Sequence, residues 1–172
     1  GHNMGNLLMA GLTQKDNGDF AKAVQELSRI LAVKGQVLPV TVDDVRICGQ
    51  MADGGVVQGE TDMVADPRTI RRVFLQPATC QPLPAVLQAI AEAEYIILGP
   101  GSLYTSIITN LLVPGVTAAI HHSAAKVYYI CNAATQRGEM ELTDAADYVT
   151  AIEEHSVKGL IHHILVNTGP VS

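Results

Sequence analysis

The sequence predicts an α/β fold with a doubly wound, mainly parallel sheet and a small antiparallel β insertion. Short apolar segments alternate with longer amphipathic ones from Pro82 onward, which is the pattern of repeated βα units. The chain has no Trp and 4% aromatic residues, so Val, Ile, Leu and Ala must form the core, as in strands buried on both faces. Asp53-Gly54 lies between Val45–Ile47 and Val56–Val57, a pattern that predicts a hairpin. We expect one domain over residues 1–172.

The first half of the chain is predicted to contain two helices before the antiparallel insertion. Residues 5–13 are small and mostly apolar, as at the start of a helix. From Phe20 to Leu31 the apolar residues follow i, i+3, i+4 spacing, with Asp19 as the expected N-cap and Gly35 as the expected end. Arg71–Leu75 is predicted to be a further strand, because β-branched and aromatic residues run up to Pro77 there.

The second half of the chain is predicted to alternate between strands and helices. Pro114-Gly115 separates two helical segments because neither residue continues a helix well. The predicted helices are Leu83–Ala93, Ser102–Leu112, Val116–His122 and Asp144–His155, and the predicted strands are Tyr95–Leu98, Val127–Cys131 and Ile164–Val166.

Charge and cysteine content exclude several classes of protein. Lys and Arg number 11 against 17 Asp and Glu, a net charge of −6 with no basic run, so nucleic acid is not an expected partner. Cys48, Cys80 and Cys131 form no CxxC pair, which argues against a disulfide framework or a zinc site and favours the cytoplasm. No apolar run is long enough to predict membrane insertion.

The loop from Gly99 to Ser102 is the strongest candidate for a binding site. It follows a predicted buried strand and precedes a predicted helix, where backbone N–H groups and the helix dipole favour a phosphate group. Gly99 and Gly101 would let an oxyanion approach the backbone, and Ser102, Thr105 and Ser106 would add hydroxyl donors. The loop matches neither the Walker A nor the GxGxxG pattern, and a tight strand–helix turn without a ligand would have the same sequence.

Two further segments carry candidate ligand contacts. Asn132 follows a predicted strand, so a parallel sheet would place it at the same edge as Gly99; it could orient a ligand or simply close a turn. His2, Asn3 and Asn6 lie at the head of the first predicted helix. His2 could contact a ligand or be the remnant of a tag, and the asparagines could be helix caps.

No metal site is predicted from the sequence. His121-His122 and His162-His163 are pairs of adjacent residues, whose side chains should point in different directions on a helix or a strand. Asp43-Asp44 could hold a cation, but a solvated turn is the favoured interpretation of the pair. Strand alternation is expected to turn one side chain of Arg71-Arg72 outward, with a salt bridge as its default role.

Several segments occur in the order found in a known protein family. The chain resembles the bacterial gluconeogenesis factor family (YvcK-type), which is related to the 2-phospho-L-lactate transferases of deazaflavin cofactor biosynthesis. The segments that carry the resemblance are Gly1-His2-Asn3-Met4-Gly5-Asn6-Leu7-Leu8, Leu38-Pro39-Val40-Thr41, Leu98-Gly99-Pro100-Gly101-Ser102-Leu103-Tyr104-Thr105-Ser106-Ile107, Asn110-Leu111-Leu112-Val113-Pro114-Gly115, and Cys131-Asn132 with Thr135-Gln136.

The resemblance implies a Rossmann-like fold with a ligand site at the carboxyl edge of the sheet. It implies a cytosolic regulator that binds a nucleotide sugar such as UDP-N-acetylglucosamine and serves gluconeogenic growth and cell shape. The transferase relatives imply an alternative, an enzyme that transfers a phospholactyl group to a deazaflavin with a divalent metal such as Mg²⁺; whether this chain is an enzyme is left open. A homo-oligomer is expected by analogy. The positions carried over are Gly99, Gly101, Ser102, Thr105 and Asn132, with His2, Asn3 and Asn6.

The sequence also departs from the family pattern. Family members begin with a strand and a Gly-Gly-Gly-Thr-Gly loop that contacts phosphate, and this sequence does not contain that segment. We therefore expect the chain to be a fragment of a longer family member. A third hypothesis, an interaction subunit with a vestigial pocket, remains beside the regulator and the transferase.

Overall fold

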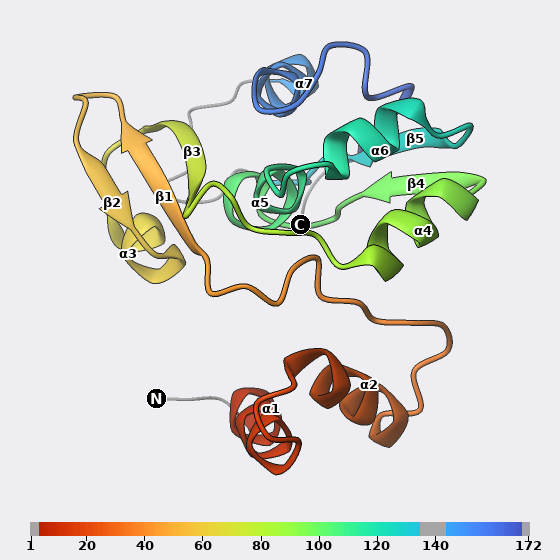
Figure 1. The fold of residues 1–172 in the computed structure, drawn as a ribbon. Coiled ribbons are helices and arrows are strands. Elements are labelled where there is room, and N and C mark those ends of the chain that lie inside the picture. The colour runs from red at the N-terminus through yellow and green to blue at the C-terminus, as the bar shows by residue number, and fades with distance from the viewer. Residues whose placement is uncertain (1–3, 135–143, 170–172) are drawn as a thin grey trace.

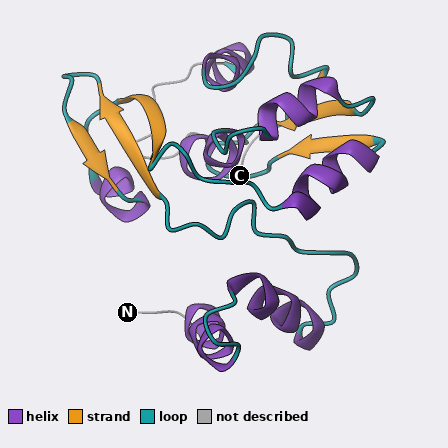
Figure 2. Ribbon diagram, viewed as in Figure 1, coloured by secondary structure: helices purple, strands orange, loops and turns teal. Residues whose placement is uncertain are grey.

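The computed structural model describes residues 4–134 and 144–169, and it has a mixed α/β architecture (Figures 1 and 2). Two three-stranded sheets are present, one antiparallel and one parallel. The strands are β1 (Arg46–Met51), β2 (Val56–Gln58), β3 (Ile70–Gln76), β4 (Tyr95–Leu98), β5 (Lys126–Ile130) and β6 (His163–Leu165). The helices are α1 (Met4–Lys15), α2 (Phe20–Ile30), α3 (Glu60–Ala65), α4 (Pro84–Glu92), the π-helical turn η1 (Leu103–Ile108), α5 (Thr109–Leu111), α6 (Val116–His122) and α7 (Ala145–Glu154).

The helices α1 and α2 form a hairpin that lies apart from both sheets in Figure 1. Asp19 caps α2, since its side chain accepts a hydrogen bond from the backbone N–H of Lys22 at 2.9 Å, as the sequence predicts. An ion pair of 2.7 Å between Lys22 and Asp16 links the two helices. The helix α2 ends at Ile30, before the expected Gly35, and an extended segment then leads to β1.

The predicted antiparallel insertion is confirmed and includes the strand predicted at residues 71–75. The strand order is β2-β1-β3, and β1 is antiparallel to both neighbours. Gly54 in the hairpin turn has a φ of +87°, a conformation that suits glycine. Arg68 joins the β1–β2 turn to the segment after α3, because its guanidinium group contacts Asp53 at 3.0 Å and Asp66 at 2.7 Å.

The second sheet is parallel, as the alternation of strands and helices predicts. Its order is β4-β5-β6, which follows the order of the chain. The reversal of strand order that defines a doubly wound sheet is therefore not among the described strands. The parallel sheet brings the carboxyl ends of its three strands to one edge, where the glycine loop, Asn132 and Asn167 follow β4, β5 and β6.

The core lies on one face of the parallel sheet. Val127 and Tyr129 of β5 are buried there among side chains of η1, α6 and α7. On the opposite face, Tyr95 and Ile97 of β4 and Leu165 of β6 are exposed. Alternation along the strands explains this difference, since successive side chains point to opposite faces.

None of the described helices is by itself long and apolar enough to cross a membrane. Leu103–Leu111 and Val116–His122 meet this requirement only when taken together, and they are separated by a bend of 74°. Both segments contribute buried side chains to the core.

Candidate functional site at the carboxyl edge of the parallel sheet

A hollow of about 460 Å³ lies where the three parallel strands end. Each strand contributes to it through residues at or just after its carboxyl end, as expected for this edge of such a sheet. The described lining residues are Pro100 after β4, Ile130, Cys131, Asn132 and Ala133 at the end of β5, and Leu165, Val166 and Asn167 at the end of β6.

Asn132 joins the second strand end to the glycine loop. Its side-chain Nδ2 donates a hydrogen bond of 2.9 Å to the backbone carbonyl of Gly101. The predicted placement of Asn132 at the same edge as Gly99 is thus confirmed, although the two segments are 31 residues apart at this bond. The amide group holds the loop in place and lies at the wall of the hollow.

The glycine loop requires glycine at position 99 for two reasons. Gly99 has a φ of +92°, which side chains rarely adopt, and an added Cβ would lie 3.0 Å from the carbonyl oxygen of Ile130. Gly101 is also crowded, because its Cβ would lie 3.3 Å from the Cβ of Ser106. The backbone of the loop therefore packs against the end of β5 with no side chain between them.

The helix after the loop begins differently from the expected regular helix over 102–112. Its first turn is a π-helix, in which the N–H of Ile107 reaches the carbonyl of Ser102 at 3.0 Å. The hydroxyl of Thr109 donates to the carbonyl of Tyr104 at 2.7 Å, which helps to satisfy a carbonyl in the widened turn. Such single-turn widenings occur often at functional sites.

The three predicted hydroxyl groups have different surroundings. Ser102 precedes the π-helical turn and does not cap it with its side chain. The Thr105 hydroxyl is enclosed and makes no hydrogen bond to the described residues. Its capacity to donate and to accept a hydrogen bond is therefore not used by them. Ser106, the next residue of the π-helical turn, is exposed.

The structure does not bring the N-terminal candidate to the glycine loop. Asn6 lies on α1 and lines a separate hollow of about 610 Å³ together with other residues of the α1–α2 hairpin. His2 and Asn3 lie outside the described residues. A contact of this helix with a ligand at the strand ends remains a prediction.

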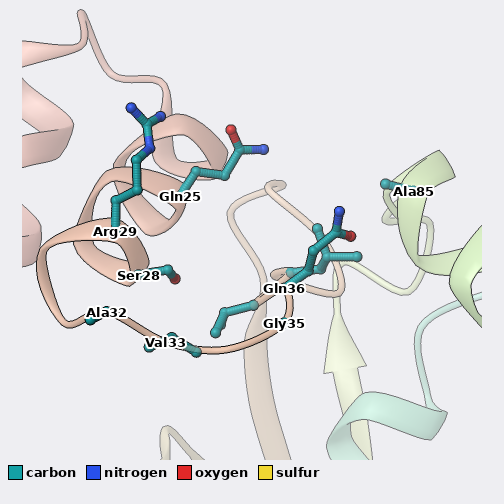
Figure 3. Close-up of a pocket in the computed structure, with 10 residues that line it drawn as sticks. Gln25, Ser28, Arg29, Ala32, Val33, Gly35, Gln36 and Ala85 are labelled. Atoms are coloured by element: carbon teal, nitrogen blue, oxygen red, sulfur yellow. The ribbon is translucent and has the colours of Figure 1, made fainter.

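A further cavity of about 500 Å³ lies between α2, the extended segment after it and α4 (Figure 3). Gln25 and Arg29 of α2 lie on one side of it and Gln36 on the other, while Ala85 of α4 closes one end. None of its described lining residues belongs to the glycine loop or to the strand ends. The sequence-based prediction did not include this cavity, because its wall is formed by segments that only the tertiary structure brings together.

Two histidines outside the predicted site accept hydrogen bonds from backbone N–H groups. His155 accepts from the N–H of Val73 through Nε2 at 3.0 Å, so its Nδ1 carries the proton and donates to the carbonyl of Ala151 at 2.7 Å. Burial lowers the pKa of His155 below its usual value of 6.5. His162 accepts from the N–H of Val127 at 3.0 Å, whereas the ring of the adjacent His163 stacks on Tyr128.

The rings of the other histidine pair approach each other more closely than expected. His121 and His122 were expected to diverge, yet their ring centroids lie 5.5 Å apart in an edge-on arrangement. A hydrogen bond of 2.7 Å between Nδ1 of His122 and the carbonyl of Ala118, one helical turn earlier, holds the His122 ring against the helix and beside the ring of His121. In residues 4–134 and 144–169, no group of three or more His, Cys, Asp or Glu side chains is arranged to hold a metal ion.

A divalent metal at the strand ends does not fit the described residues. The described lining of the hollow contains no carboxylate. Asp43, a candidate cation ligand from the sequence, does not line the hollow; it accepts a hydrogen bond of 2.7 Å from the N–H of Gln81. Burial raises the pKa of the Cys48 and Cys80 thiols, which favours their protonated form.

One lining residue escaped the sequence-based prediction. Asn167 follows the third parallel strand just as Asn132 follows the second, and it lines the same hollow. Its amide oxygen accepts a hydrogen bond of 3.0 Å from the N–H of Gly169, a turn that orients the side chain. The signal was available in the sequence, because every polar residue that follows a parallel strand lies at the same edge.

Comparison with known protein families identifies this architecture. The family described as 2-phospho-L-lactate transferase CofD matches the chain over residues 1–172. The chain belongs to the CofD family. Its relatives within this family include proteins named gluconeogenesis factor, so the resemblance seen in the sequence is confirmed.

Individual members of the CofD family are close in sequence and structure. The gluconeogenesis factor of Halalkalibacterium halodurans is 45% identical over 100% of this chain and 53% of its own length, and that of Bacillus subtilis is 46% identical over 98% of this chain and 53% of its own length. A crystal structure of a Bacillus halodurans protein has a TM-score of 0.93 at 45% identity, covering 100% of this chain and 55% of the other. The chain therefore spans about half the length of the relatives it matches.

Proposed function

We propose that the chain is part of a cytosolic regulator that binds a nucleotide sugar similar to UDP-N-acetylglucosamine. The observation that carries the proposal is the hollow at the ends of three parallel strands, with Asn132 bonded to the glycine loop. Ligands of open α/β sheets bind at this edge. The volume of about 460 Å³ lies within the range of small-molecule sites.

The parts of the hollow suit different parts of such a ligand. The diphosphate would lie beside Pro100, the glycine-loop residue that lines the hollow. Backbone N–H groups of the loop at Gly99 and Gly101, and the hydroxyls of Ser102, Thr105 and Ser106, would donate to it once the loop moves away from the packing that now encloses Thr105. The base or sugar would be oriented by Asn132 and Asn167, whose amides supply both donors and acceptors. A lining without described carboxylates avoids repulsion of the phosphates.

The biological role proposed for the whole protein follows its relatives. Proteins named gluconeogenesis factor match nearly the full chain, which supports a role in growth on gluconeogenic carbon sources. We propose a further role in cell shape. We propose that His2, Asn3 and Asn6 approach the ligand when the rest of the polypeptide is present, and that the protein is a homo-oligomer with no nucleic-acid partner.

The finer features of the fold belong to the same proposal. The face of the parallel sheet with Tyr95 and Ile97 is exposed, and relatives are about twice as long as this chain. A second layer of helices on this face would complete a doubly wound, Rossmann-like domain, because such sheets are covered on both faces.

The alternative is an enzyme that transfers a phospholactyl group to a deazaflavin with Mg²⁺. The description of the family as 2-phospho-L-lactate transferase favours this function. It requires metal ligands near the phosphate site, and the described strand ends supply none. Those ligands would then come from residues outside the described ranges.

Calorimetric titration of the complete polypeptide with UDP-N-acetylglucosamine tests the proposal. Asn132→Ala removes the group that holds the carbonyl of Gly101, so we expect binding to weaken by about 1–3 kcal/mol. Gln88→Ala is the control, because it removes an amide from the exposed face of α4, where Gln88 bonds only to Glu92 among the described residues. The control should bind like the unchanged protein.

The results separate the two functions. Binding of UDP-N-acetylglucosamine without Mg²⁺, lost in Asn132→Ala and kept in Gln88→Ala, supports the regulator. Binding of a deazaflavin or GDP that requires Mg²⁺ would contradict the regulator and support the transferase. Equal affinities for Asn132→Ala and the unchanged protein would remove the strand-end hollow from the proposal.

A further inference from the structure

A β-bulge in the antiparallel sheet places two arginines side by side. Along β1 and β3, Gln50 pairs with Arg72 and Met51 pairs with Ile70, so Arg71 has no partner and is the additional residue of the bulge. The bulge interrupts the alternation of the strand, and Arg71 and Arg72 are both exposed between buried Ile70 and Val73. The expectation that alternation separates the two arginines is therefore wrong.

The two arginines also lack the ion pairs expected of them. Within residues 4–134 and 144–169, no carboxylate lies within 4.0 Å of either guanidinium group, whereas Arg68 of the same insertion contacts two aspartates. The chain has 17 acidic residues against 11 basic ones, so acidic partners are plentiful. Two guanidinium groups that line one cavity, with no ion pair to the described residues, repel each other, and a bound anion would relieve that repulsion.

A cavity of about 540 Å³ opens beside these arginines. Its described lining consists of Gln50, Arg71, Arg72, Glu154 and His155, which come from β1, from β3 and from the C-terminal end of α7 (Figure 1). Gln50 and Arg72 are direct neighbours across the two strands. The lining thus combines two cations, one amide and one carboxylate at a single opening.

His155 gives this cavity a rigid wall. Its two ring nitrogens are engaged by Val73 and Ala151, and its ring packs edge-on against Tyr104 at a centroid distance of 5.8 Å. The imidazole is neutral in this arrangement, so it neither competes with the arginines for an anion nor adds to their charge. Arg72 and Glu154 are the charged groups that act on it.

We propose that the cavity lined by Gln50, Arg71, Arg72 and Glu154 binds a small phosphorylated molecule that carries a hydroxyl group. The planar guanidinium groups match phosphate oxygens in pairs, and the Gln50 amide adds a further donor. Glu154 lies at the opening, where its carboxylate accepts a hydrogen bond from the hydroxyl group. None of these residues lines the hollow at the strand ends, so the site is distinct from the nucleotide-sugar site and does not depend on it.

Inorganic pyrophosphate is the probe that tests the site at constant ionic strength. The titration of the complete polypeptide is followed by the backbone amide resonances of Gln50, which lines the cavity, and of Val73, whose N–H donates to His155 in its wall. We expect saturable shifts, with affinity weakened about 10- to 100-fold in Arg71→Gln and in Arg72→Gln. Both side chains are exposed, so circular dichroism should show an unchanged fold.

Arg46→Gln is the matched control, because Arg46 is an exposed arginine at the far end of β1 in the same sheet. It changes the net charge equally and should leave the affinity within about twofold. An equal loss in Arg46→Gln, or no saturable shift in the unchanged protein at millimolar pyrophosphate, would overturn the proposal. Asn132→Ala should leave these shifts unchanged, so failure of the nucleotide-sugar proposal would not affect this one.

Discussion

Replacement of His155 by Ala tests how the antiparallel sheet is attached to the rest of the fold. The strand β3 lies at the edge of its sheet, and the N–H of buried Val73 on this edge donates to Nε2 of His155 on the other side of the junction. The change removes the only acceptor described for that N–H. It also removes the ring that packs on Tyr104.

The expected magnitude follows from these two contacts. A buried N–H left without an acceptor costs about 1–3 kcal/mol. The lost edge-on ring contact adds about 0.5–1.5 kcal/mol. We therefore expect His155→Ala to lower the free energy of unfolding by about 2–4 kcal/mol, which for a domain of this size lowers the melting temperature by about 5–10 °C.

Urea denaturation at two pH values measures both the loss and its cause. Burial lowers the pKa of His155 in the folded state, so the unfolded chain binds the proton more tightly. The stability that His155 contributes is fully present above its unfolded pKa and is lost as pH falls below about 6.5. The unchanged protein should therefore lose more stability than His155→Ala between about pH 7.5 and about pH 5.5.

His121→Ala is the control, because His121 is exposed on α6 and takes no part in this junction. It should denature like the unchanged protein at both pH values. A loss below about 0.5 kcal/mol in His155→Ala would refute the assigned hydrogen bond. An equal pH dependence in His155→Ala and the unchanged protein would refute the neutral, buried imidazole.

The remaining predictions concern the glycine loop and the hairpin insertion. Gly99→Ala should lower the free energy of unfolding by about 1–3 kcal/mol, because residue 99 has a positive φ and the added Cβ would press on the carbonyl of Ile130. A chemical denaturation curve measures this loss. Gly11→Ala is the control, because Gly11 lies in a helix with open space around it, and it should not destabilise the protein. Hydrogen bonds from the Arg68 side chain lower the pKa of Asp66 to about 2, so its contribution to stability is present above about pH 4 and is lost as pH falls through about 2. Asp66→Asn should reduce this acid sensitivity in a pH titration followed by circular dichroism, and an unchanged acid transition would contradict the ion pair.

Local sequence determined most of the helices and strands. Asp19 caps α2 through a bond to Lys22, three residues away, and Asp144 caps α7 through bonds to Ala146 and Asp147. Such contacts lie within one helical turn, so the residue types and their spacing suffice to predict them. The position of Asn132 at the same sheet edge as the glycine loop was also predictable, because the carboxyl ends of parallel strands must meet at one side of the sheet.

The tertiary structure decided the features that depend on register and packing. The bond between Val73 and His155 joins residues 82 positions apart, and the bulge at Arg71 arises from the pairing of β1 with β3. No local pattern fixes such a register, since one residue of slip reverses every side chain of a strand. The position of Asn6 away from the glycine loop has the same origin, because its helix packs on α2 and not on the sheet edge.

The class of fold, the loop between β4 and η1, and the edge at which Asn132 lies could all be predicted from the amino-acid sequence. The contact between Asn132 and Gly101, the π-helical turn after the loop, and the shared cavity of Arg71 and Arg72 follow from the packing of distant segments. The physical reason is the range of the interactions. Helix caps and turns are fixed by neighbouring residues, whereas strand register and the packing of side chains are fixed by segments that are distant in the chain.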